Sequence, residues 1–356
     1  MATFTPRQRM ITARSGRRPD KLPVFVAAAN SFICRYYGLS VTEYLTDARR
    51  AAESQIALIK DFNLDGCVIA SGYILYGCGP ELGVDWRFSG DDWPGFSSGP
   101  LKTEADLESL KIPGSPSGYF AHYLEIISRT SAALGQSHAL NANILGPFAA
   151  LCFLRGIEKA LLDTALNPGF FSKCLAFCTD LSIYFGRAVL ATDVPATTLN
   201  EIFLTPQMIS PESYHRQIAP ADRRVQEALT PNQPPNIMGA FMGQPGDRTS
   251  QKGARALYRA FFGIGESVDS IRAAFEHKIP GLPFPLSVSG RMLDAWPVDR
   301  IIAYLEEGLD FLVGRCGIFP SLNLISIQAE SRDKAAAVAE KLKALVAFRD
   351  HYRLGD

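Results

Sequence analysis

The sequence predicts an α/β protein of the (β/α)8 TIM-barrel class. Short apolar runs, typical of strands buried on both faces, alternate along the chain with longer amphipathic stretches of helical period. The length of 356 residues suits such a barrel. The segment after the first apolar run, "VAAANSFICRYYG", lacks the GxGxxG turn of an open dinucleotide-binding sheet. We therefore expect a single domain over residues 1–356, with an N-terminal extension of about residues 1–20.

Each predicted element follows from its local pattern. "LPVFVAAA" (22–29) is an apolar run of strand length, and residues 41–62 place apolar groups at helical spacing. Residues 250–277 are mostly helical by pattern, with a short strand near 262–268 as an alternative. The other strands are expected at 64–71, 139–145, 196–202, 235–242, 284–289 and 309–314, and the other helices at 118–135, 167–192, 211–228, 297–307 and 332–350.

Composition excludes several classes of protein. The chain has 36 basic and 36 acidic residues, so it lacks the net positive charge of a nucleic-acid binder, and the N-terminal arginine cluster is expected to be solvated. Its seven cysteines are scattered without CxxC spacing, which is typical of reduced thiols in a core. The sequence shows neither a signal-peptide pattern nor a run of about 18 apolar residues, so we expect a cytoplasmic protein without a membrane span.

Candidate site residues follow from the barrel prediction, because TIM barrels bind their substrates at the carboxyl ends of the strands. Cys316 and Glu201 are the candidates for chemistry. A buried thiol is the alternative for Cys316, and a salt bridge to Arg155 or Arg291 is the alternative for Glu201. The candidate substrate-binding residues are Arg35, Tyr73, Asn143, Phe153, Met242, Arg291 and Asn323.

Several segments resemble the uroporphyrinogen decarboxylase superfamily, which includes the corrinoid-dependent methyltransferases. "NILGPFAALCFLRG" resembles the family's Gly-x-Pro-Phe segment, and "NEIFLTPQMISPESYHRQIAP" resembles its acidic residue followed by Ser-Pro. "RCGIFPSLNLISI" resembles the Gly-Cys-Gly ending of the methyltransferases. The likeness spans nearly the whole chain and implies a barrel of this family.

The resemblance also implies what this chain lacks. Gly72 stands where the decarboxylases carry the Asp that holds the pyrrole nitrogens, so the chain is not expected to be a true uroporphyrinogen decarboxylase. The methyltransferases bind zinc through a His-x-Cys pair, a last Cys and often an acidic residue. Cys316 and Glu201 match the last two, whereas Ala240 and Met242 replace the pair, which leaves an incomplete zinc site.

Three functions stay open. The first is a methyltransferase that moves a methyl group between a corrinoid or a methylated small molecule and an acceptor, with a corrinoid protein as a partner. The second is a metal-independent lyase or decarboxylase acting on a small carboxylated or aromatic substrate, with Glu201 as its acid–base group. The third is a non-catalytic tetrapyrrole- or corrinoid-binding protein. The resemblance further implies a homodimer, with the hairpin around Trp86 and Trp93 in the contact.

Overall fold

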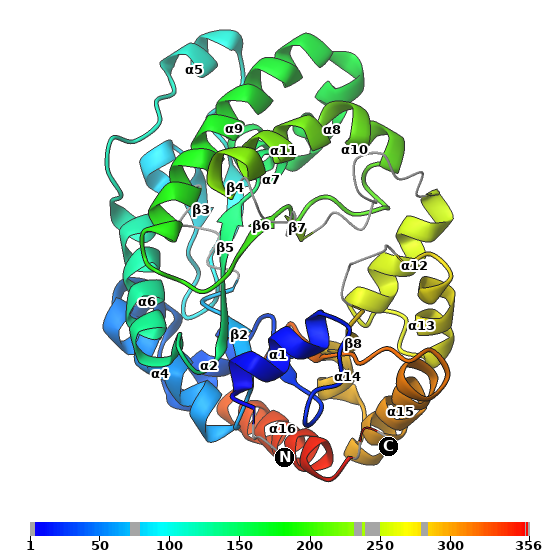
Figure 1. Ribbon diagram of the computed structural model, residues 1–356. Coiled ribbons are helices and arrows are strands. Elements are labelled where there is room, and N and C mark those ends of the chain that lie inside the picture. Colours follow the sequence, from blue (N-terminus) through cyan, green and yellow to red (C-terminus); the bar gives the residue numbers. More distant parts are fainter. Residues whose placement is uncertain are drawn as a thin grey trace. The chain divides into compact units, whose positions relative to one another are not determined.

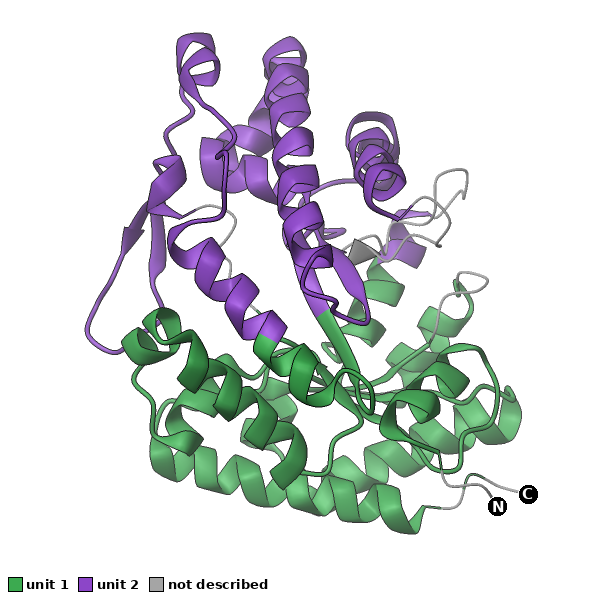
Figure 2. Cartoon of the chain, turned by 60° about the vertical axis from the view of Figure 1, so that its left-hand side comes forward, with its two compact units in different colours: residues 1–72, 129–141, 255–356 green, residues 73–128, 142–254 purple. Residues whose placement is uncertain are grey.

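The computed structural model describes residues 4–71, 79–230, 250–278, 284–352 and 354, together with the backbone of 237–238. The chain divides into two compact units (Figure 2). Unit 1 comprises residues 1–72, 129–141 and 255–356, and unit 2 comprises residues 73–128 and 142–254. The single domain over residues 1–356 stays a prediction.

Both units contain parallel strands (Figure 1), as the apolar runs predicted. In unit 1 the strand order is β5–β2–β1–β9–β8, and in unit 2 it is β5–β6–β7, because β5 passes from one unit into the other. All of these pairs are parallel. The strands are β1 (Val24–Val26), β2 (Gly66–Val68), β5 (Ala139–Leu145), β6 (Thr197–Asn200), β7 (Ile237–Met238), β8 (Leu286–Ser289) and β9 (Leu322–Ile325). The predicted hairpin is also present, as the antiparallel pair β3 (Asp85–Arg87) and β4 (Gly95–Ser98).

Helices follow the strands along the chain. Those of unit 1 are α1 (Pro6–Arg14), α2 (Asn30–Tyr37), α3 (Val41–Thr46), α4 (Ala48–Asp61), α13 (Val268–Phe275), α14 (Gly290–Ala295), α15 (Val298–Leu309) and α16 (Arg332–His351). Those of unit 2 are α5 (Glu104–Ser109), α7 (Pro147–Arg155), α8 (Ile157–Leu166), α9 (Pro168–Leu190), α10 (Pro211–Gln217) and α11 (Ala219–Leu229), with a 3₁₀ turn at Pro80–Leu82. Helices α6 (Gly118–Leu134) and α12 (Gln251–Phe261) contain residues of both units.

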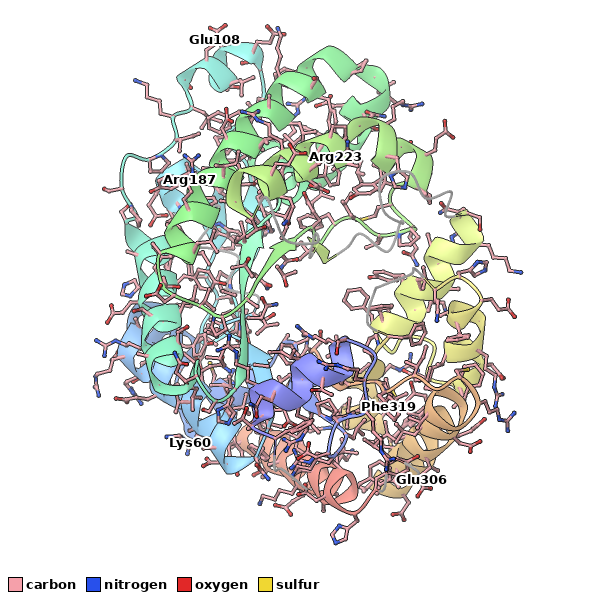
Figure 3. All side chains as sticks on the ribbon, viewed as in Figure 1. Lys60, Glu108, Arg187, Arg223, Glu306 and Phe319 are labelled. Atoms are coloured by element: carbon pink, nitrogen blue, oxygen red, sulfur yellow. The ribbon has the colours of Figure 1, made fainter. Side chains whose placement is uncertain are left out.

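Local capping divides two of the predicted helices. The helix expected at 41–62 breaks at Asp47, whose extended backbone ends α3 and whose carboxylate accepts a hydrogen bond from the Arg50 N–H at the start of α4. The helix expected at 211–228 breaks before Pro220, which lies in the first turn of α11. The charged outer faces of such helices carry side chains that point away from the core, as Lys60 and Glu306 do (Figure 3).

The strand expected at 309–314 is wrong. Helix α15 continues into a π-helical turn over Asp310–Arg315, with Leu305, Leu309 and Leu312 fully buried at helical spacing. A short apolar run is compatible with either structure by its pattern alone. The last strand is β9, which pairs with β1 and β8, so Cys316 precedes a strand instead of following one.

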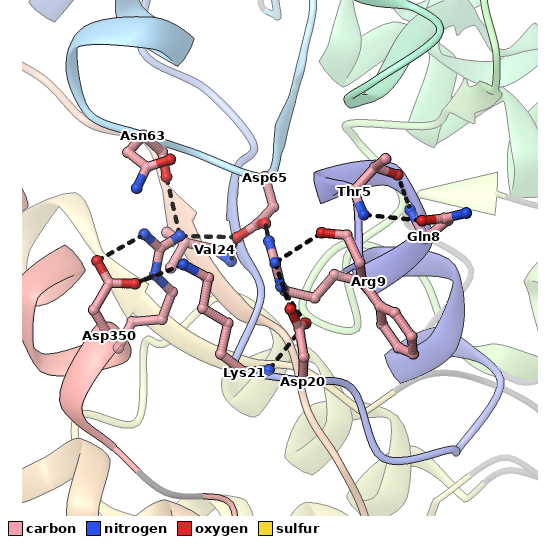
Figure 4. A network of polar contacts seen from close by, with 11 residues as sticks. Thr5, Gln8, Arg9, Asp20, Lys21, Val24, Asn63, Asp65 and Asp350 are labelled. Carbon is pink, nitrogen blue, oxygen red and sulfur yellow. Dashed lines mark hydrogen bonds and ion pairs between the residues drawn. The ribbon is translucent and has the colours of Figure 1, made fainter. Parts of the chain in front are cut away.

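The N-terminal extension is part of the packed structure of unit 1. Met10 on α1 packs against Phe25 and Val68. Arg9 is 4% exposed and pairs with Asp20 and Asp65 (Figure 4), which corrects the expectation of a solvated arginine cluster at this position. Asp65 also binds Arg349 of α16 at 3.1 Å. None of the helices within the described ranges is long and apolar enough to cross a membrane.

Candidate functional site

Strands β5 and β6 present a polar row on one face of the unit 2 sheet. Asn143 lies opposite Thr198, and Leu145 lies opposite Asn200. Opposed residues of a parallel pair point to the same face, and residues two apart along a strand do so as well. Asn143, Thr198 and Asn200 are 3%, 7% and 4% exposed. Buried, uncharged hydrogen-bonding groups therefore gather on this face, with Asn200 at the carboxyl end of β6.

Glu201 reaches the opposite face. It shares that face with Leu199 by alternation, and a Cβ atom added to Gly146 would lie 2.3 Å from the Glu201 carboxyl carbon. Only glycine leaves room for the carboxyl group at this position. The acidic side chain and the Asn200 amide are consecutive in sequence but point to opposite faces of the sheet.

The Glu201 carboxyl group caps the N-terminus of helix α7. Its Oε1 accepts a hydrogen bond from the Phe148 N–H at 2.9 Å, and its Oε2 accepts one from the Ala149 N–H at 2.7 Å. These amides have no partners within the helix, and the positive end of the helix dipole favours an acidic group there. Glu201 therefore fixes the turn between β5 and α7.

A second buried acid completes this cluster. Asp222 on α11 is 1% exposed and accepts a hydrogen bond from the Tyr214 hydroxyl at 3.1 Å. The Asp222 and Glu201 carboxyl groups lie close enough for each to affect the pKa of the other. Burial, and then the charge of Asp222, raises the pKa of Glu201 well above its usual range, and burial raises the pKa of Asp222 to about 7. Both carboxyl groups therefore hold their protons to a higher pH than exposed acids do.

The salt bridges considered for Glu201 are not formed. Arg155 pairs with Asp163 at 2.8 Å, and Arg291 pairs with Glu266 at 3.2 Å. Both Glu201 oxygens accept backbone hydrogen bonds, and the side chain is fully buried. This arrangement suits a residue that positions α7, and a catalytic role for Glu201 stays a prediction.

The Cys316 thiol lies half-buried in the turn before β9, in unit 1. Cys316 was expected to belong to the site because it was predicted to follow a strand. In the structure it follows a helical turn instead. The described part of the chain contains no group of three or more His, Cys, Asp or Glu side chains able to hold a metal ion. With Glu201 bound to backbone amides and to Asp222, the residues that are described do not fit a zinc site.

The candidate substrate-binding residues lie on separate elements. Phe153 is in the core of unit 2, with ring centroids 5.4 Å from Trp86, 5.8 Å from Phe96 and 5.2 Å from Phe203. In unit 1, Arg35 lies in the last turn of α2, the Arg291 side chain on α14 is 80% exposed, and Asn323 on β9 accepts a hydrogen bond from the Ser321 hydroxyl at 2.9 Å. Tyr73, Ala240 and Met242 lie outside the described residues.

Sequence reasoning missed Asn200, Asp222 and Tyr214. The signal for Asn200 was the alternation of side chains along "TTLNEI", which places Asn200 on one face of the strand and its neighbours Leu199 and Glu201 on the other. The signal for Asp222 was its place between Ile218 and Val225, at helical spacing on a buried stripe. No local pattern pointed to Tyr214, because its partner lies on the next helix.

Comparison with known proteins agrees with this architecture. The sequence profile of the uroporphyrinogen decarboxylase family matches residues 5–276. The chain is 21% identical to "Methylcobamide:CoM methyltransferase MtaA" of Methanosarcina barkeri, over 99% of each chain. The structure of a "methyltransferase from Methanosarcina mazei" superposes with a TM-score of 0.73 at 18% identity, covering 98% of both chains, and supports the TIM-barrel-like fold. The chain belongs to the uroporphyrinogen decarboxylase family.

Proposed function

We propose that this protein is an enzyme of methyl transfer, which moves a methyl group between a corrinoid and a small molecule. The observation that carries the proposal is the end-to-end match to a relative named as a methylcobamide methyltransferase. A corrinoid protein is the proposed partner, since a methylated corrinoid is the methyl source in that name. The loss of the decarboxylase Asp, replaced by Gly72, also favours this branch over porphyrinogen decarboxylation.

The residues of the chain supply binding and positioning in this proposal. The row formed by Asn143, Thr198 and Asn200 ends with Asn200 at the carboxyl end of β6, the end at which barrels of this class bind substrates. Glu201 and Asp222 hold the β5–α7 turn next to that row. The proposal includes no zinc-activated thiolate, because the described residues do not fit that site.

Methylcobalamin supplies the direct test. The purified chain would be mixed anaerobically with methylcobalamin and a series of small acceptors, among them the 2-mercaptoethanesulfonate named for the relative, and cobalt–carbon cleavage would be followed by visible absorbance. Enzyme-dependent demethylation supports the proposal. Release of CO₂ from a carboxylated substrate without demethylation would favour the lyase, and tight corrinoid binding without turnover would favour a binding protein.

We also propose a homodimer, on the basis of the family resemblance alone. Trp86 was expected in the dimer contact, but its side chain is 7% exposed and packs on Phe96 and Phe153 within unit 2, so little of it is free to meet a partner. Sedimentation at micromolar concentration tests the assembly, and a monomer there would remove it from the proposal.

A further inference from the structure

The amide of Asn200 is the most unusual polar group on the β5–β6 face. Its side chain is 4% exposed, and its Oδ1 atom has no hydrogen-bond partner among the residues that the structure describes. A buried amide oxygen without a partner costs about 1–3 kcal/mol, so native chains rarely keep one without a use for it. The position is also the last residue of β6, the end of the strand at which TIM barrels bind their ligands.

The chemistry of the face restricts what can bind there. Its members from β5 and β6 in unit 2 are Asn143, Leu145, Thr198 and Asn200, and none of them carries a charge. The nearest acid in sequence, Glu201, points to the opposite face and binds α7. An anion placed against this row would lose its hydration without gaining a cation, which is unfavourable.

From this geometry we infer that Asn200 binds an uncharged hydrogen-bond donor of the substrate, such as a carboxamide N–H or a hydroxyl group. The inference rests on the proposed function and adds the class of group recognised. Two molecules in a methyl transfer can supply it, the carboxamide periphery of the corrinoid or a neutral methyl acceptor. If the methyl acceptor supplies the group, the chain would differ from its relative, whose named acceptor, CoM, carries a sulfonate.

Two matched ligand pairs distinguish the sources. The corrinoid pair is methylcobalamin and its derivative with one carboxamide hydrolysed to a carboxylate, compared by equilibrium binding. The acceptor pair is 2-mercaptoethanol and 2-mercaptoethanesulfonate, compared by the KM and kcat of methyl transfer. We expect the wild type to prefer the neutral member of at least one pair.

Asn200→Leu keeps the size of the side chain and removes its hydrogen bond. It should weaken binding of the preferred neutral ligand about tenfold, the effect of one such bond, and leave the charged member unchanged. Leu199→Val, on the other face of the same strand, is the control for a general effect on β6. Circular dichroism and thermal unfolding check that each variant is folded, and Asn200→Ser, which keeps a hydroxyl at the position, should recover part of the affinity.

The outcomes separate the two proposals. If Asn200→Leu loses affinity only in the corrinoid pair, the donor that Asn200 binds is a corrinoid carboxamide. If it loses affinity only in the acceptor pair, the donor belongs to the methyl acceptor. If a folded Asn200→Leu variant keeps the wild-type affinities, or the wild type prefers both charged ligands, the inference is overturned while methyl transfer stands. If the wild type neither binds nor demethylates methylcobalamin, the proposed function is wrong and this inference with it.

Discussion

Burial of Glu201 and Asp222 should make the stability of the folded chain depend on pH, and Asp222→Asn should remove the part of that dependence that Asp222 contributes. Asparagine does not titrate. Its amide can donate to a Glu201 oxygen and accept from the Tyr214 hydroxyl, so the variant keeps the contacts of the cluster. The change therefore separates the titration of Asp222 from the packing around it, and the contribution of Glu201 remains.

The expected magnitude follows from the burial of Asp222. Its pKa is raised from 3.8 to about 7, so between these values the folded chain keeps a proton that the unfolded chain has lost. The free energy of unfolding then falls as the pH rises through this window. At about 1.4 kcal/mol per pH unit, the fall reaches roughly 4 kcal/mol above pH 7. Asp222 is 1% exposed, so solvent screening does not reduce this figure.

Urea unfolding followed by circular dichroism, repeated between about pH 4.5 and 8, measures the effect. Relative to the wild type, Asp222→Asn should gain stability steadily across the range. Asp180→Asn is the control, because Asp180 forms an exposed pair with Arg224 at 2.5 Å and its loss should shift the curve little. Parallel curves for wild type and Asp222→Asn would refute the raised pKa of Asp222.

Three further predictions concern other parts of the chain. Gly146→Ala should lower the free energy of unfolding by roughly 1–3 kcal/mol through overpacking, whereas Gly114→Ala, with open space around it, should change little in thermal unfolding. Asp65→Asn removes the carboxylate that Arg9 and Arg349 share, although each keeps a second one, and should cost about 1.5–3 kcal/mol, against less than about 1 kcal/mol for the exposed Asp294→Asn; equal losses would contradict the buried network. Cys316→Ser and wild type should have the same zinc content by elemental analysis, and a stoichiometric zinc lost in the variant would restore Cys316 as a ligand.

Periodicity predicted most of the fold because strands and helices with a buried face repeat their apolar residues at fixed intervals. The strand at 139–145 and the helix ending the chain agree with β5 and α16 within a residue at each end. The run at 309–314 was misassigned because a six-residue apolar segment satisfies both periods, and what decides between them is the tertiary pairing of the next segment, 322–325, with β1. Helix α7 was missed because its apolar residues follow the preceding strand almost without a break.

The candidate site was harder to predict because chemistry-bearing residues were chosen by type and by distance from a strand end. Cys316 was tied to a strand that is absent, and Phe153 lies in helix α7. Contacts between elements far apart in sequence, such as that of Asp222 with Glu201, leave no local trace. The family resemblance therefore predicted the fold, whereas the roles of the candidate site residues stay predictions.

Asn200 and Glu201 are consecutive at the end of β6, but their side chains point to opposite faces of the sheet and suit different functions. Glu201 carries the only charge in "TTLNEI", which drew attention to it, yet it follows Leu199 onto the face that packs on α7. Two backbone amides already donate to its oxygens and Asp222 lies beside its carboxyl group, so a substrate would have to break those bonds to reach it. Asn200 points the other way and has an unused acceptor. In this strand the uncharged residue is the better candidate for contact with a ligand, and the charged residue is the better candidate for holding the turn beside it.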